Sequence, residues 1–147
     1  MSRLSERFFR EAKDFMDANK FENEEQANAA LQDFIEQYNE SLRSDTGRNP
    51  ETSWDYLDMA VDAPTEKEAV KYAKKALELD AYCTDAEVMI ADIQYGRDPE
   101  KFKKKLEKII AKTEKHLREE GFFDDDCIGD FWGILETRPY IRARHAY

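Results

Sequence analysis

The chain has 147 residues, of which 41% are hydrophobic and 38% charged, with five glycines and four prolines. A chain of this length can bury a sizeable core, and this composition excludes a disordered tail and favours a helix-rich protein. The formal net charge of −10 disfavours nucleic acid and anionic membranes as partners.

Apolar residues recur every three or four positions at the start of the chain, which predicts a hairpin of two helices over residues 1–44. Asn23 is expected to cap the second helix, with Gln26 three positions later. The segment 43–53, RSDTGRNPETS, gathers turn-forming residues and predicts the longest loop. We therefore place a boundary between an N-terminal hairpin, 1–44, and a second part that begins near Ser53.

Residues that typically start or end helices divide the middle of the chain into further predicted helices. A helix that begins near Ser53 is stopped by Pro64. Capping boxes, in which a threonine and a glutamate three residues later bond each other's backbone, are predicted to open the next two helices. They are Thr65 with Glu68 and Thr84 with Glu87.

A long helix is predicted after Gly96, with Asp98 as its cap and Pro99 at its first position, where the missing N–H costs nothing. It is expected to run to Gly121. Its apolar stripe comprises Phe102, Leu106, Ile109, Ile110, Thr113 and Leu117. Beside this stripe, Lys101, Lys105, Lys108, Lys112 and Lys115 form a basic stripe.

The last part of the chain predicts two short helices. The segment 127–135, CIGDFWGIL, follows Asp124, Asp125 and Asp126, which favour a helix start through the macrodipole. Thr137 and Pro139 then announce a final helix of about two turns. It carries a second basic set, which comprises Arg138, Arg142 and Arg144. With no strand signal, the pattern predicts an all-α array of antiparallel helical hairpins.

Two segments resemble known repeat proteins. The segment 69–87, AVKYAKKALELDAYCTDAE, resembles the second helix of a tetratricopeptide repeat and its junction, with Ala69 and Ala76 as the small residues seven apart. The segment 130–144, DFWGILETRPYIRAR, is similar to one in bacterial tetratricopeptide-like proteins of undefined function, which are related to the eukaryotic suppressor-of-tumorigenicity repeat proteins. The resemblance implies a right-handed superhelix of tetratricopeptide-like hairpins over 53–147, with the last hairpin incomplete. It also implies that Arg138, Arg142 and Arg144 pair with acids of the preceding helix.

The residues predict no catalytic, cofactor or metal site. His116 is expected in solvent and His145 at a frayed end, and neither has a nucleophile at a workable spacing. Cys83 and Cys127 are interpreted as reduced thiols of a cytoplasmic protein, because no signal peptide or membrane-spanning segment is present in the sequence. The three aspartates lack the ligand spacing of a calcium loop, so helix capping is the favoured interpretation. The chain is therefore not expected to be an enzyme.

Stacked hairpins leave a concave face that binds protein segments, so we expect a protein-binding or scaffold module. If the last hairpin is incomplete, Tyr140 and Ile141 should be exposed to solvent or to a second copy, which would give a homodimer. The candidate partner-binding residues are Lys101, Lys105, Lys108, Lys112, Arg138, Tyr140 and Arg142. Two alternatives remain open: a regulatory helical domain of a longer polypeptide, and a weak nucleic-acid binder that uses the lysine stripe.

The aromatic residues are expected mainly in the core; they are Trp54, Tyr56, Phe131, Trp132 and Tyr140.

Overall fold

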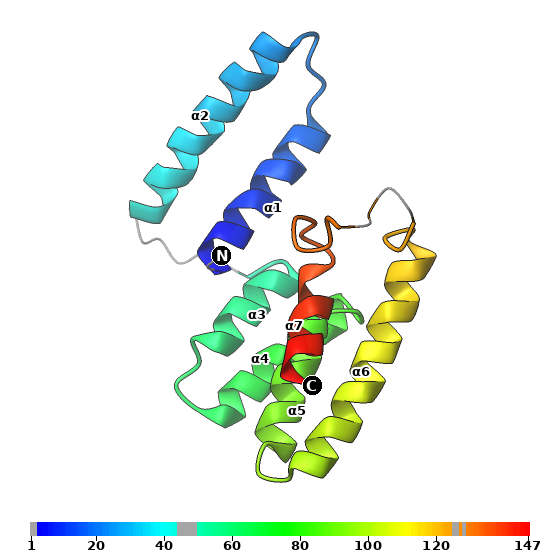
Figure 1. The fold of residues 1–147 in the computed structure, drawn as a ribbon. Coiled ribbons are helices and arrows are strands. Elements are labelled where there is room, and N and C mark those ends of the chain that lie inside the picture. The colour runs from blue at the N-terminus through cyan, green and yellow to red at the C-terminus, as the bar shows by residue number, and fades with distance from the viewer. Residues whose placement is uncertain (1–2, 44–49, 125–126, 128) are drawn as a thin grey trace. The chain divides into compact units, whose positions relative to one another are not determined.

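The computed structural model describes residues 3–43, 50–124, 127 and 129–147. These residues form seven α-helices and no strand, which confirms the predicted all-α class for the described part of the chain. The chain divides into two compact units, Met1–Asn49 and Pro50–Tyr147 (Figure 1).

The first unit is a hairpin of α1 (Arg3–Ala18) and α2 (Glu24–Arg43), which run antiparallel (Figure 1). Asn23 caps α2 as predicted, because its side-chain oxygen accepts a hydrogen bond from the backbone N–H of Gln26 at 2.9 Å. Aromatic rings fill the space between the two helices. The ring of Phe34 stacks on Phe15 with centroids 5.0 Å apart, and Phe8 meets Tyr38 edge to face at 5.2 Å.

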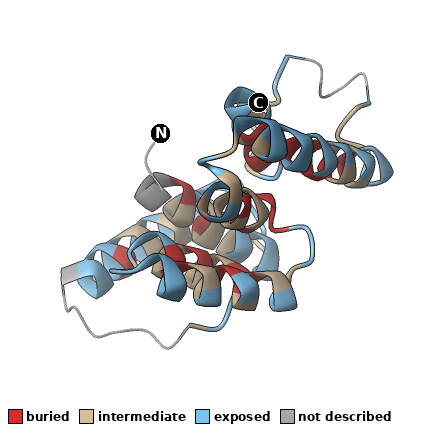
Figure 2. Ribbon diagram, turned by 90° about the horizontal axis from the view of Figure 1, so that it is seen from below, coloured by how far each residue is buried: buried red, intermediate tan, exposed pale blue. Residues whose placement is uncertain are grey.

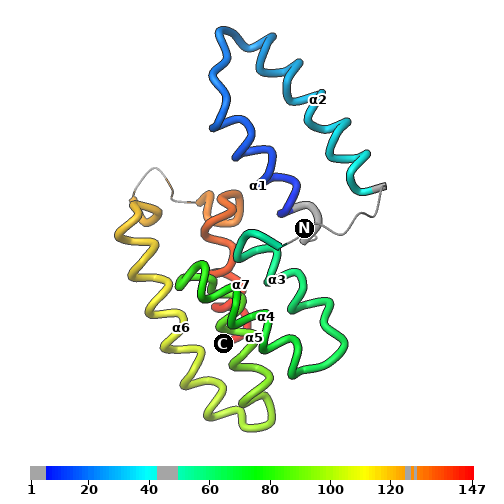
Figure 3. The backbone as a smooth tube through the Cα atoms, turned by 180° about the vertical axis from the view of Figure 1, so that it is seen from behind, coloured from blue at the N-terminus to red at the C-terminus, as the bar shows by residue number. Residues whose placement is uncertain are grey.

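The second unit packs its helices in chain order. The helices α3 (Ser53–Val61), α4 (Glu66–Leu79), α5 (Thr84–Tyr95) and α6 (Pro99–Glu119) each pack against the next (Figures 1 and 3). The last helix, α7 (Arg138–Ala146), packs against both α5 and α6. The second unit is therefore a run of neighbouring helices that the C-terminal helix closes.

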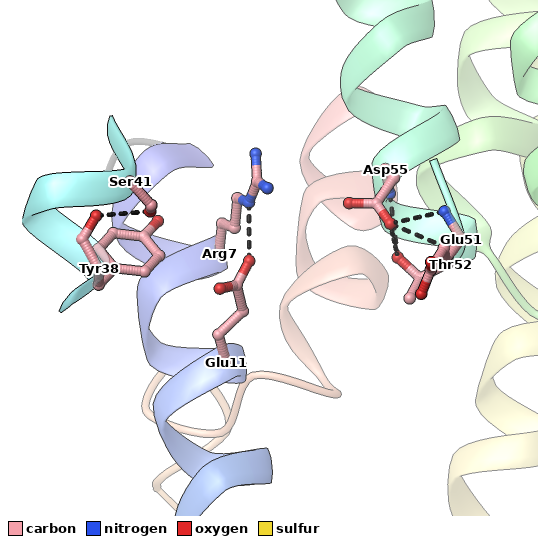
Figure 4. Close-up of polar contacts among 7 residues, drawn as sticks. All are labelled: Arg7, Glu11, Tyr38, Ser41, Glu51, Thr52 and Asp55. Carbon is pink, nitrogen blue, oxygen red and sulfur yellow. Dashed lines mark hydrogen bonds and ion pairs between the residues drawn. The ribbon is translucent and has the colours of Figure 1, made fainter. Parts of the chain in front are cut away.

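Threonine and aspartate side chains start three of these helices. Thr65 caps α4 and Asp98 caps α6, as predicted, but the predicted box at Thr65 is not reciprocal, because the Glu68 carboxylate accepts from the Thr65 hydroxyl at 3.0 Å and not from its backbone. A capping box of Thr52 and Asp55 opens α3 (Figure 4). Sequence reasoning had not identified this box. Figure 4 also shows two local contacts of the first unit, Arg7 with Glu11 and Ser41 with the Tyr38 carbonyl.

The predicted capping box at Thr84 is wrong. The cap position of α5 is Cys83, which makes no capping bond through its side chain. Thr84 lies inside the first turn with 1% of its surface exposed, and its hydroxyl is 2.8 Å from that of Thr113 on α6. The buried bond between helices thus replaces the expected local one.

Two further boundaries differ from the sequence prediction. The long helix α6 ends at Glu119, and Gly121 follows with a φ of 83°, a backbone conformation that favours glycine. The described residues of the segment 127–135 form turns and no α-helix. The single glycines at 129 and 133 interrupt this segment.

Two clusters of buried residues hold the second unit together, and Figure 2 shows the buried positions as stripes along the helices. The first cluster, between α3, α4 and α5, is made of small residues and one leucine: Leu57, Ala60, Ala73, Ala76, Cys83 and Ala86. The second joins α6 to α7: Leu106, Ile110, Leu117, Tyr140 and Ala143. Within the described residues, no helix is long and apolar enough to cross a membrane.

Candidate functional site

The solvent face of α6 carries the predicted lysine stripe. Opposite it, the predicted apolar stripe is buried at Leu106, Ile109, Ile110, Thr113 and Leu117, and Phe102 is half-buried. Because Lys101, Lys105, Lys108 and Lys115 are exposed and Lys112 is half-buried, the stripe lies on the side of α6 that faces away from the core. Lys104 is also exposed at the same face, three residues after Lys101 and four before Lys108.

The lysines of α6 differ in their partners. Lys101 lies 2.8 Å from the Asp98 carboxylate. The side-chain hydrogen bond between them lowers the pKa of Asp98 and raises that of Lys101. Lys115 lies 3.7 Å from Glu119. Lys104, Lys105 and Lys108 make no ion pair with any residue that the structure describes, so the lysines in the middle of the stripe have no carboxylate partner there.

Lys112 fastens α6 to the start of α5. Its amine donates to the Glu87 carboxylate at 2.9 Å and to the Ala81 carbonyl at 2.5 Å, and it lies 5.3 Å from the centre of the Tyr82 ring. Tyr82 in turn stacks on His116 with centroids 3.7 Å apart. His116 is half-buried, so its predicted position in solvent is wrong. Tyr82, which sequence reasoning did not select, keeps 43% of its surface exposed at this end of the stripe.

The predicted exposure of Tyr140 is wrong, since only 9% of its surface is accessible and Ile141 is half-buried. Tyr140 packs in the second core cluster and donates its hydroxyl to Glu114 at 3.0 Å. Burial first, and then this hydrogen bond, raises the pKa of Tyr140. The pKa of Glu114 is lowered by its hydrogen bonds from Arg118 and from Tyr140, in that order. The homodimer prediction therefore loses the exposed surface on which it depended.

Two arginines of α7 are also held within the fold. Arg142 forms two hydrogen bonds to Asp85 on α5, whereas the resemblance implied acids of the preceding helix as its partners. Arg138 is 5% exposed and donates to the Trp132 carbonyl at 2.9 Å. These two residues and Tyr140 stabilise the position of α7, which removes them from the set that can meet a partner. Arg144 is exposed.

Within the described residues, the remaining polar candidates do not gather into a reactive site. Asp124 is exposed, and Asp125 and Asp126 lie outside the described residues. His145 is exposed on α7, and the Cys83 thiol is buried. No group of three histidine, cysteine or carboxylate side chains within the described ranges is placed to hold a metal ion.

The aromatic residues expected in the core divide into two groups. Trp54 and Tyr56 pack against the first core cluster, and Phe131 packs against the second. Trp132 is 51% exposed, which contradicts the expectation of burial. Its neighbour Phe131 takes the inward position in a segment that forms turns, where helical spacing does not decide which side chain points inward.

Comparisons with protein families, with curated proteins and with solved structures found no match for this chain. Of the seven candidate partner-binding residues, Lys101, Lys105 and Lys108 remain exposed on one helix face. The structure adds Lys104 and Tyr82 to this set. The candidate site is therefore the solvent face of α6 and the exposed ring at its end.

Proposed function

We propose that the chain is a non-catalytic protein-binding module, built as a tetratricopeptide-like, right-handed array of helical hairpins in the cytoplasm. Its second unit would present several helices at once to a partner, as a scaffold or recognition surface. This proposal rests on one main observation, the alanine-rich core between α3, α4 and α5.

Alanines at helix contacts let neighbouring helices approach closely. Ala73, Ala76 and Ala86 are 0% exposed, and Ala60 is 2% exposed. A core made of such small side chains binds hairpins side by side, which suits an array more than a bundle around large apolar residues. Ala69 and Ala76, the two positions that carry the family resemblance, are both buried on α4.

The order of helix packing supports the same proposal. In an array of repeats, each hairpin contacts only its neighbours along the chain. With α5 and α6 as one hairpin, α7 takes the place of the next first helix, since it packs on both. Protein binding is then the function that such an array serves best.

The experiment that tests this function is affinity capture with the tagged full chain from a nuclease-treated lysate, at low and moderate salt, read by mass spectrometry. Hydrogen exchange on the recovered complex then locates the protected helices. A matched control is Ala76→Asp, which places a carboxylate at a fully buried position and disrupts the hairpin core.

A protein that the native chain retains at moderate salt, that the Ala76→Asp chain does not retain, and that protects helices of the second unit would support the proposal. Proteins retained equally by both chains bind unfolded segments. If the native chain retains no protein of the first kind, a protein-binding function is contradicted.

A further inference from the structure

The helix α6 separates its charges around its axis. At 3.6 residues per turn, six lysines fall within an arc of about 100°, on the side opposite the buried stripe. Glu100, Glu107 and Glu114 recur every seven residues along one flank, where the hydroxyls of Tyr147 and Tyr140 donate to Glu107 and Glu114. The six lysines are Lys101, Lys104, Lys105, Lys108, Lys112 and Lys115.

This separation works against the stability of the helix. Like charges four residues apart on a helix repel each other, and three such pairs occur on this face. They are Lys101 with Lys105, Lys104 with Lys108, and Lys108 with Lys112. Tyr147, which follows α7, donates its hydroxyl to Glu107 at 2.8 Å, and Glu107 is the glutamate three residues after Lys104. The lysines remain on one face although their mutual repulsion destabilises the helix. This indicates that a negatively charged surface binds to the face.

We propose that this lysine face docks an acidic segment of a partner protein, an inference that rests on the proposed protein-binding function. The stripe from Lys101 to Lys115 is about 21 Å long at 1.5 Å per residue, which matches about six extended residues or four turns of a partner helix. Lys104, Lys105 and Lys108 stand at its centre and supply the charges with no ion-pair partner among the described residues.

The size and sign of the charge favour a protein segment over nucleic acid or membrane. The whole chain carries −10, so a long polyanion or a charged lipid plane would extend beyond the stripe and meet a repulsive field. A short acidic segment centred on Lys104, Lys105 and Lys108 meets the lysines that have no ion-pair partner among the described residues. Carboxylates pair well with lysine as a compact charge, whereas phosphate recognition commonly uses the fork of arginine.

The aromatic rings and the arginine near the stripe are already engaged. The face of Tyr82 is stacked on His116 and faces the Lys112 amine, so it offers little room for a base to stack. Arg118, the arginine of α6, donates to Glu114 at 2.8 Å and lies over the Phe123 ring. The ring of Tyr82 and the guanidinium of Arg118 are thus already in contact with other side chains of this chain.

The test measures fluorescence anisotropy of a labelled glutamate-rich peptide with the full chain, at ionic strengths of about 0.01 M and about 0.15 M. The variant is Lys105→Glu with Lys108→Glu. The control, Lys67→Glu with Lys74→Glu, makes the same charge change at two exposed positions of α4. Circular dichroism checks that both variants fold. We expect the α6 variant to weaken binding at least about tenfold and the control less than about threefold.

Three results would overturn the proposal. They are native-like peptide binding by the α6 variant, an equal loss in the control, and tighter binding of a single-stranded oligonucleotide or of anionic vesicles than of the peptide. Capture of the lysate partner distinguishes a failure of this inference from a failure of the proposed protein-binding function. If the α6 variant still captures that partner, the protein-binding function stands and the lysine face is not its site. If the native chain captures none, the function itself fails.

Discussion

Arg142 on α7 donates two hydrogen bonds to the Asp85 carboxylate on α5, from Nε to Oδ1 at 3.0 Å and from Nη2 to Oδ2 at 2.5 Å. The side chain of Asp85 is 8% exposed and that of Arg142 is 31% exposed. A carboxylate at this depth keeps its charge at low cost only while a partner compensates it. The pair therefore joins the last helix to the middle of the second unit.

Removing the arginine should destabilise the protein. We expect Arg142→Ala to lower the free energy of unfolding by about 2–4 kcal/mol, because the buried Asp85 carboxylate loses its partner. Urea unfolding followed by circular dichroism measures the change. The control Arg144→Ala removes the same charge from an exposed position of the same helix and should change stability by less than about 0.5 kcal/mol. Equal effects of the two variants would contradict the role of the pair.

Local patterns predicted the seven α-helices and several of their ends, together with a helix at 127–135 that the described residues do not form. Thr65 and Asp98 were identified as caps because the capping bond lies within three residues of sequence. Thr84 fits the same pattern and yet its hydroxyl meets Thr113, which lies 29 residues away. A local motif contains no information on such a partner, so the prediction failed where a tertiary contact competes with a cap.

The candidate site shows the same division between local and distant information. Helical periodicity was enough to find the lysine face, since exposure on α6 follows from the buried stripe opposite. It could not show three side-chain bonds between helices: Lys112 to Glu87, Tyr140 to Glu114, and Arg142 to Asp85. These contacts depend on how α5 and α7 pack, and this packing brings together residues that the sequence separates by at least 25 positions.

The buried hydroxyl pair between α5 and α6 gives a second prediction. In Thr113→Val the shape is kept, but the Thr84 hydroxyl loses a partner at 2.8 Å and retains only the Tyr82 carbonyl at 3.2 Å. We expect a loss of about 1–2 kcal/mol, measured by urea unfolding. The double variant with Thr84→Val should lose at least about 0.5 kcal/mol less than the sum of the two single changes. Strict additivity would show that the two hydroxyls are not coupled.

The capping box of α3 gives a third prediction. The Thr52 side chain accepts from the Asp55 backbone at 3.2 Å, and the Asp55 carboxylate accepts from the Thr52 backbone at 2.9 Å. Thr52→Ala should therefore lower the free energy of unfolding by about 1 kcal/mol, as measured by thermal unfolding. Thr52→Ser keeps the hydroxyl and serves as the control. If the serine variant loses as much stability as the alanine variant, the cap is not the source of the effect.

The hydroxyl of Tyr140 predicts how stability depends on alkaline pH. Burial, and then the hydrogen bond to Glu114, raises the pKa of Tyr140 above its ordinary value of 10.0. Its contribution to stability is therefore fully present below pH 10.0 and is lost as the pH rises through the higher folded value. Tyr140→Phe should remove about 1 kcal/mol at neutral pH and reduce the alkaline loss seen by urea unfolding. Tyr147→Phe, at an exposed tyrosine that bonds Glu107, should leave both unchanged. An alkaline loss of native size in Tyr140→Phe would show that another group causes it.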